Sequence, residues 1–371
     1  MECNILIDLN EFLNDTNIFK YILPIIEDNV VYTFKTNEEL KQAINEWYED
    51  KENAIIKYGH IKIWNTKYIT DMSYLFHNKS EFNEEVTFWN TSNVKDMKEM
   101  FSRVWSFNQP LNFDTSNVTN MSGMFYQASS FNQPLNFNTS KVIGMANMFS
   151  AAWSFNKPLN FDTRNVKDMS YMFEGADSFN QSLNFDTSNV IIMNDMISNS
   201  SSFNQPINFD TSKVTDMNHM FFALESFNQP INFDTCNVKK MNGMFSNTVS
   251  FNQPINFTST SKVTNMNNMF DGAESFNQPI NFDTKNVTKM VYMFHDATSF
   301  NQPLNFNTLK LKKMSGMFYN AKSFNSELNL RTVNVNEMKD IFLDCPINKS
   351  NINFMSDDDT SSYSEYSTSD Y

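Results

Sequence analysis

Residues 107–130 read FNQPLNFDTSNVTNMSGMFYQASS, and this stretch decides the fold. The Phe-Asn pair that opens it returns every 24 or 25 residues along most of the chain. The pair begins at Phe82, Phe107, Phe131, Phe155, Phe179, Phe203, Phe227, Phe251, Phe276, Phe300 and Phe324. Self-similarity at a fixed period of this length indicates a solenoid, in which each unit buries its apolar side chains against its neighbours.

Each unit has two halves with different hydrophobic periods. Leu111 and Phe113 flank Asn112 in strict alternation, which predicts a short, half-buried strand. From Val118 to Ala128 the apolar residues recur at every third or fourth position, which predicts a short helix or 3₁₀ turn. The expected fold is therefore an α/β repeat solenoid with one strand and one helical turn per coil. Eleven coils spaced by about 4.8 Å would be about 50 Å long.

The repeat divides the chain into three predicted parts. Residues 1–59 would form an N-terminal segment with a helical cap, and residues 60–350 a solenoid of about 11 or 12 repeats. Residues 351–371 are rich in Asp, Ser and Tyr without apolar periodicity, which predicts a disordered acidic tail.

Two helices are expected before the first coil. Thr36 and Glu39 match a capping box, and apolar residues follow at helical spacing as far as Glu49. A second helix is expected over residues 51–58, where Gly59 would end it. Together these helices would cover the open edge of the first coil, which would otherwise invite aggregation.

Composition excludes several classes of function. The chain has 28 basic and 42 acidic residues, and the net charge of −14 argues against nucleic acid and anionic membranes as partners. Three cysteines without disulfide or metal spacing favour a reducing compartment. The start of the sequence lacks a secretory leader, and no run approaches about 18 apolar residues. We expect an intracellular monomer that does not insert into membranes.

Two recurrent asparagines are expected to have different roles. The one that follows each opening Phe, as at Asn108 and Asn132, would hydrogen-bond the turn backbone of adjacent coils. The one between the two strand apolar residues would point outward and is the candidate partner-binding residue. This candidate rank is Asn112, Asn136, Asn160, Asn184, Asn208, Asn232, Asn256, Asn281 and Asn305.

Other recurrent residues have a functional and a structural interpretation. The pair Met121 and Met124 has a spacing by which thioethers bind Cu(I), but its position between apolar sites favours core packing. A Thr rank such as Thr115 could order water, although local turn partners favour a structural role. Carboxylates such as Asp114 suggest calcium, yet the GGxGxD nonapeptide is absent. We predict no metal site and no cofactor.

Enzymatic activity is not expected. The sequence contains no GxSxG, HExxH, Walker or GxGxxG motif. The recurrent carboxylates lie in similar coils, not in the contrasting environments that separate an acid from a base. The histidines share no ligand spacing and are expected to be solvated surface residues, namely His60, His77, His219 and His295.

One coil departs from the pattern. In the unit that begins at Phe179, Ser182 replaces Pro, Ile197 replaces Phe and Ser200 replaces the small Ala. Loss of an aromatic ring is expected to loosen packing, so we predict a weak joint near residues 180–202.

The phrases SFNQPLNFDTSNVTNMSGMF (residues 106–125) and FWNTSNVKDMKEMF (residues 88–101) resemble the BspA-like leucine-rich-repeat family, first known among bacterial surface proteins. The lead-in over residues 39–66 is similar to the segment that precedes such repeats in protist and giant-virus members. The resemblance implies a right-handed LRR-like array with a binding role, often adhesion, and no catalysis. A viral member would act in the host cytoplasm or in the virion, with the cell surface as the alternative.

We therefore expect a non-enzymatic protein–protein interaction scaffold that presents an extended surface to a protein partner. The alternatives are a surface adhesin for host cells or matrix, and a structural or water-ordering array. Variable residues on the helical side would give specificity if that side binds: Arg103, Tyr126, Glu174, His219, Phe222 and His295.

Overall fold

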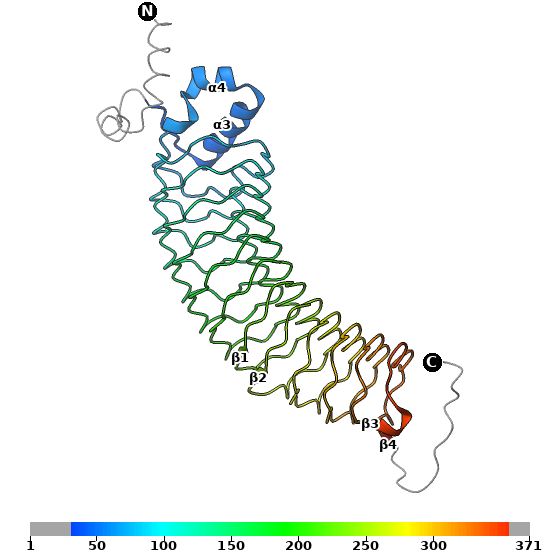
Figure 1. Cartoon of the computed structure of the whole chain (residues 1–371). Helices are drawn as coiled ribbons and strands as arrows, with labels where there is room; N and C mark the ends of the chain where they lie inside the picture. Colours follow the sequence, from blue (N-terminus) through cyan, green and yellow to red (C-terminus); the bar gives the residue numbers. More distant parts are fainter. Residues whose placement is uncertain (1–30, 356–371) are drawn as a thin grey trace, which may run out of the picture.

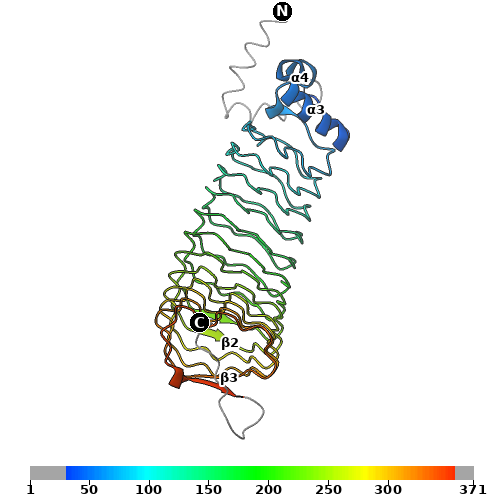
Figure 2. The ribbon, with the colours of Figure 1, turned by 90° about the vertical axis from the view of Figure 1, so that its right-hand side faces the viewer.

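The structure is a computed structural model that describes residues 31–355 as a curved stack of coils with two helices at its N-terminal end (Figures 1 and 2). Helix α3 (Asn37–Glu49) begins after Thr36, whose hydroxyl accepts the Glu39 N–H at 3.1 Å. Helix α4 (Lys51–Tyr58) ends at Gly59, which has a φ of +74°. Both helices lie where the sequence predicted them. The structure of residues 1–30 is outside the described part.

The helices share one core with the coils. Trp64, which precedes the first complete unit, packs edge-on against Trp47 of α3 with ring centroids 5.7 Å apart. On its other side Trp64 stacks on Trp89 of the next coil at 6.2 Å. Because the aromatic contacts continue from the cap into the array, the cap excludes water from the first coil.

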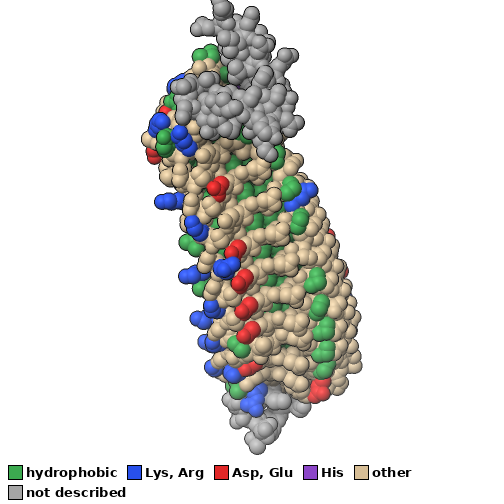
Figure 3. Space-filling model, turned by 90° about the vertical axis from the view of Figure 1, so that its left-hand side faces the viewer, with side chains coloured by type: hydrophobic (Ala, Val, Ile, Leu, Met, Phe, Trp, Pro, Cys, Tyr) green, Lys and Arg blue, Asp and Glu red, His purple; other side chains and the backbone are tan. Residues whose placement is uncertain are grey.

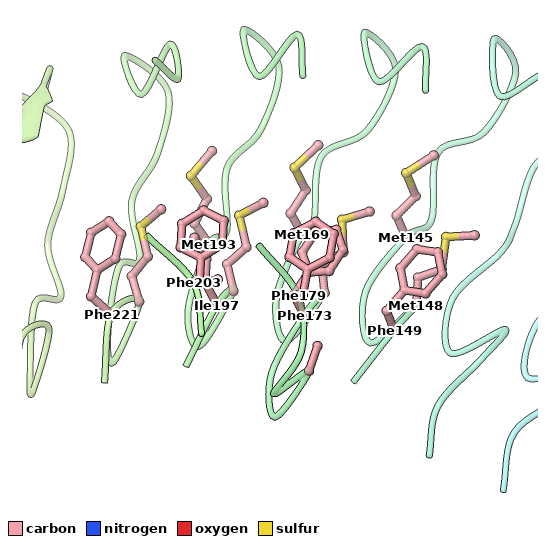
Figure 4. Packing of buried hydrophobic residues seen from close by; sticks show 14 of the residues in the cluster. Met145, Met148, Phe149, Met169, Phe173, Phe179, Met193, Ile197, Phe203 and Phe221 are labelled. Carbon is pink, nitrogen blue, oxygen red and sulfur yellow. The ribbon is translucent and has the colours of Figure 1, made fainter. Parts of the chain in front are cut away.

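Methionine and phenylalanine fill the core of every complete coil. Met121, Met124 and Phe125 are each 0% exposed, and so are their equivalents in the neighbouring coils. The rings form continuous columns, with Phe125 5.5 Å from Phe149 in the next coil. Figure 4 shows the methionines beside these rings in four successive coils. This burial supports the core interpretation of the paired methionines, since flexible thioethers fill irregular gaps between stacked rings.

The predicted strand is present in only a few coils. Within residues 31–355, the strands are β1 (Ile231–Phe233), β2 (Ile255–Phe257), β3 (Leu328–Arg331) and β4 (Ile352–Met355). β1 pairs with β2, and β3 with β4, in parallel. Elsewhere the segment is extended, with single bridges such as Leu111 to Leu135. The prediction of one strand per coil was therefore wrong.

The second half of each unit is not helical, contrary to prediction. In most coils every second N–H donates to the following coil, while the N–H groups between them close tight turns, as from Met124 to the Met121 carbonyl at 3.1 Å. In the unit of residues 107–130 the inter-coil bonds are Met121 to Gly144, Gly123 to Ala146, Phe125 to Met148 and Gln127 to Ser150. A positive φ at both Gly123 and Gln127 interrupts the helical conformation and turns alternate N–H groups toward the next coil.

The C-terminal end of the described chain contains a short 3₁₀ helix, η2 (Lys349–Asn351), and β4. The predicted disordered tail therefore began too early, because residues 351–355 pair with or lead into the sheet of β3. An Ile and a Phe in β4 continue the apolar alternation of the repeat, and Phe354 packs on Phe342 at 6.4 Å. The rest of the predicted tail, residues 356–371, lies outside the described residues.

Candidate functional site

The nine predicted asparagines form one exposed rank. Each is exposed, and in most coils the residues on both sides of it are buried, as Leu111 and Phe113 are around Asn112. Asn232 and Asn256 bond to each other, with Nδ2 and Oδ1 2.8 Å apart, where β1 meets β2. The other seven side chains make no hydrogen bond to a described residue, although each offers two donors and one acceptor. Whether this rank binds a partner stays a prediction.

The two other asparagine ranks already have partners inside the array. Asn108 Oδ1 accepts the backbone N–H of Asn132 at 2.9 Å and also an amide N–H of Gln133 at 3.1 Å. Asn117 Nδ2 donates to the Ser92 carbonyl in the preceding coil at 2.8 Å. The predicted Asn ladder is thus confirmed at its own site. Of these three asparagine ranks, only the outward one has carboxamides without a partner among the described residues, at seven of its nine positions.

A line of carboxylates runs beside the candidate rank. Each carboxylate accepts the backbone N–H of the residue two positions further on. That residue also lowers the pKa of the carboxyl, mainly through a hydrogen bond from its side chain. At Asp234 the backbone N–H of Cys236 is the main cause of the lowered pKa. The line comprises Asp114, Asp162, Asp186, Asp210, Asp234 and Asp283. Figure 3 shows acidic side chains in a line beside basic ones on the strand side of the array. Because these carboxyls have lowered pKa values, they are charged at neutral pH.

The threonine rank is buried and bonds the next coil. Thr115 is 1% exposed, and its hydroxyl donates to the Asn138 carbonyl at 3.0 Å. Thr139 and Thr163 repeat this contact with the coils that follow them. The preferred structural role is therefore supported, but its partner is the adjacent coil and not the local turn. A buried hydroxyl has no access to surface water, so this rank does not order solvent.

The histidines are only partly exposed to solvent, so the prediction of solvated surface residues was correct only in part. All four are half-buried, and two face a carboxylate at the same site of the preceding coil. His295 Nδ1 lies 2.7 Å from Asp271, and His219 Nδ1 lies 3.7 Å from Asp195. Burial raises the pKa of both Asp271 and Asp195. A search for acidic residues one repeat before each histidine would have found these pairs.

His295 also contacts a second carboxylate, because its Nε2 lies 3.2 Å from Asp296. Within residues 31–355, no group of three or more His, Cys, Asp or Glu side chains lies close enough together to hold a metal ion. In the same part of the chain, no helix has the length and apolar character needed to cross a membrane.

The variable residues lie on the turn side, where the inter-coil ladder runs. Arg103 is exposed, while Tyr126 and Glu174 are half-buried. The Ser150 hydroxyl donates to the Glu174 carboxylate at 2.6 Å, so part of this variation is used in contacts between coils. The turn side is thus more engaged in the array than the outward Asn rank.

Comparison with known proteins identifies a family. The model described as "Mycoplasma protein of unknown function, DUF285" matches residues 50–159, 111–208, 182–280 and 254–355. No curated protein and no solved structure matches the chain. The successive matches follow the tandem repeat and support the repeat-family part of the sequence resemblance.

Proposed function

Because this chain belongs to the DUF285 family of tandem-repeat proteins, we propose that it is a non-enzymatic scaffold that binds a protein partner through its outward Asn rank. The observation that carries this proposal is the difference between the three asparagine ranks. Two are engaged in bonds between coils, whereas Asn160, Asn184 and Asn208 are exposed without a described partner. Free carboxamides at regular spacing provide hydrogen bonds over an extended area without a pocket.

The charges beside the rank would fix the register of the partner. The acidic line is interrupted at Asn138 and in the Phe251 unit, where Thr258 and Ser259 stand in place of Asp. Between these interruptions, Asp162, Asp186 and Asp210 follow one another in successive coils. A partner with basic groups at the matching positions would be favoured in one register, because a shift by one coil would misplace its charges.

We further propose that the array is LRR-like and right-handed, on the strength of the BspA-like resemblance, and that it acts inside cells or in a virion. Absence of catalysis is part of the same proposal. The six carboxylates of the acidic line share one capping role and one direction of pKa shift, so they do not form an acid and base pair.

The test immobilises the full chain and captures proteins from cytosolic lysate and from intact-cell surface extract. The variant carries Asn160→Arg, Asn184→Arg and Asn208→Arg in three successive coils. A matched control adds the same charge at exposed sites on another side, with Thr119→Arg, Ile143→Arg and Ile191→Arg. Bulky positive side chains are expected to abolish binding to the Asn rank without affecting other sites.

A cytosolic partner that is lost with the Asn variant and retained with the control supports the proposal. Capture from surface extract alone favours the adhesin. Capture that survives the Asn variant moves the binding site to the turn side.

A further inference from the structure

The C-terminal end of the array leaves a row of backbone donors without partners. In the earlier coils, alternate N–H groups donate to the coil that follows, except at Met145, Ile197 and Met241, and the last such bonds include Phe318 to Ile341 at 2.8 Å. In the final coil, the equivalent N–H groups have no acceptor among residues 31–355. They belong to Met338, Asp340, Phe342 and Asp344.

The apolar core is open at the same place. Met314 and Phe318 are 0% exposed, whereas their equivalents Met338 and Phe342 in the last coil are only partly buried. β4 covers the strand side of this coil through the contact of Phe354 with Phe342, but the turn side has no such cover from a described residue. An edge with unpaired backbone donors and half-exposed core side chains can be covered by an added chain segment that supplies acceptors and apolar side chains.

The hydrogen-bonding polarity of this edge restricts what can cover it. The carbonyls that alternate with the free N–H groups already accept bonds from the preceding coil, as the Lys339 carbonyl does from Gly316 at 2.9 Å. The turn segment therefore offers donors at four alternate positions and needs a chain that presents carbonyls at the same spacing. Between them, that chain needs apolar side chains to cover Met338 and Phe342.

Two occupants from this protein do not fit. If the C-terminal ends of two copies met, the free N–H groups of one edge would face the free N–H groups of the other. In head-to-tail stacking, the edge would meet α3 of the second copy instead of an open coil. That helix already covers its own first coil, since its Asn37 side chain accepts the Thr70 N–H at 3.0 Å and its Tyr48 hydroxyl donates to the Lys79 carbonyl at 3.0 Å. Residues 356–371 follow β4 at this end, but their sequence SDDDTSSYSEYSTSDY has no Val, Leu, Met or Phe to cover the core.

We propose that residues 338–344 form a docking edge for an apolar peptide segment of another protein that adopts the turn conformation of a coil. The segment runs parallel to the edge and extends the array by part of a coil. Its alternate carbonyls accept the four free N–H groups, and its side chains replace water over Met338 and Phe342. This site is separate from the Asn rank, so the array has a lateral surface and a terminal one.

The experiment uses the full chain and a synthetic peptide that copies residues 142–152, VIGMANMFSAA. The carbonyls of this segment at Gly144, Ala146, Met148 and Ser150 accept the N–H groups of the preceding coil, so it has the required polarity. We expect saturating peptide to slow amide hydrogen exchange at the four edge positions by about tenfold or more, while interior amides are unchanged. Unchanged exchange at the edge would overturn the proposal.

Controls distinguish peptide docking from unfolding and from coverage of the edge by another part of this protein. A scrambled peptide of the same composition should not protect the edge. Phe342→Glu should abolish protection, whereas Leu343→Glu should retain it, because the Leu343 N–H bonds within its own coil to Asp340. Edge amides as slow as interior ones before any peptide is added would also refute the proposal. Deletion of residues 356–371 and a mass measurement would then show whether the tail or a second copy covers the edge.

Discussion

His295 Nδ1 lies 2.7 Å from Oδ1 of Asp271, the residue at the same site in the preceding coil. Burial raises the pKa of the Asp271 carboxyl above its ordinary value of 3.8, and the hydrogen bond with His295 opposes part of that rise. The folded protein therefore holds this proton more tightly than the unfolded chain. The stability contributed by the protonated Asp271 carboxyl is complete below pH 3.8 and is lost as the pH rises through the raised pKa.

Replacement of this carboxylate should reveal the penalty for its burial. We predict that Asp271→Asn raises the free energy of unfolding at neutral pH by less than about 1 kcal/mol, because solvent screens the half-buried site. The difference should vanish or reverse below pH 3.8. Urea titrations across the acid and neutral range measure both effects. A variant less stable than the parent at neutral pH would show that the contact with His295 outweighs burial.

The acidic line should respond to pH in the opposite direction. Each of Asp162, Asp186 and Asp210 has a lowered pKa, so its contribution to stability is present above pH 3.8 and is lost as the pH falls through the lowered value. A variant with Asn at all three should lose this contribution and be slightly less stable than the parent at neutral pH, although each Asn can still accept the turn N–H, as Asn138 does from Ser140 at 3.1 Å. Acid titration followed by circular dichroism should show less loss of structure than in the parent. An unchanged acid midpoint would contradict this account.

A matched pair of substitutions should separate structural from exposed asparagines. Asn156→Ala removes the acceptor for the Asn180 N–H at 3.1 Å and for an amide N–H of Gln181 at 2.8 Å. We expect a loss of about 1–3 kcal/mol, since buried or half-buried donors are left without a partner. Asn160→Ala, in the same coil, should change stability by no more than about 0.5 kcal/mol. Thermal unfolding of both variants tests this, and equal losses would argue against a free outward rank.

The column of phenylalanines has one aliphatic member, Ile197, between Phe173 and Phe221 (Figure 4). At each other complete coil this position donates its N–H to the next coil, but no bond joins the Ile197 N–H to the Met220 carbonyl. Ser200 partly compensates, because its buried hydroxyl donates to the Phe173 carbonyl at 2.5 Å. We therefore retain the prediction of a weak joint.

Hydrogen exchange tests the joint directly. Amides of residues 193–200 should exchange faster than those of the neighbouring coils. Ile197→Phe should restore the aromatic column and slow exchange there, with a gain of about 1 kcal/mol in stability from the added apolar area. Exchange no faster than in adjacent coils would refute the weak joint. A destabilised Ile197→Phe would instead indicate that the site is already filled.

The repeat period by itself predicted much of this molecule. Stacked coils, the buried methionines and phenylalanines, the ladder of Asn108 and Asn132, and the exposed Asn112 rank all follow from which positions recur and which are apolar. The two N-terminal helices could also be predicted from local sequence signals, because capping residues and Gly59 mark their ends.

The backbone conformation of the methionine segment could be predicted from the sequence only in part. Gly123, Gly243 and Gly316 recur at one site with positive φ, and Gly175 and Gly272 at another, which is a signal for left-handed turns. The signal is hidden because residues such as Arg103 adopt the same conformation elsewhere. A pattern of three and four residues suits a helix equally well, so periodicity did not distinguish helix from successive turns.

The sequence determined which side chains are buried in most coils, because burial depends on the hydrophobic period and that period recurs along the array. The tertiary structure decided which backbone groups bond between coils and which side chains meet across them. A left-handed residue such as Gln127 is stabilised by the neighbouring coil that accepts its N–H at 2.7 Å, and the contact of Asp271 with His295 exists only once two coils are stacked. These relations depend on long-range packing, which a single unit of the repeat does not contain.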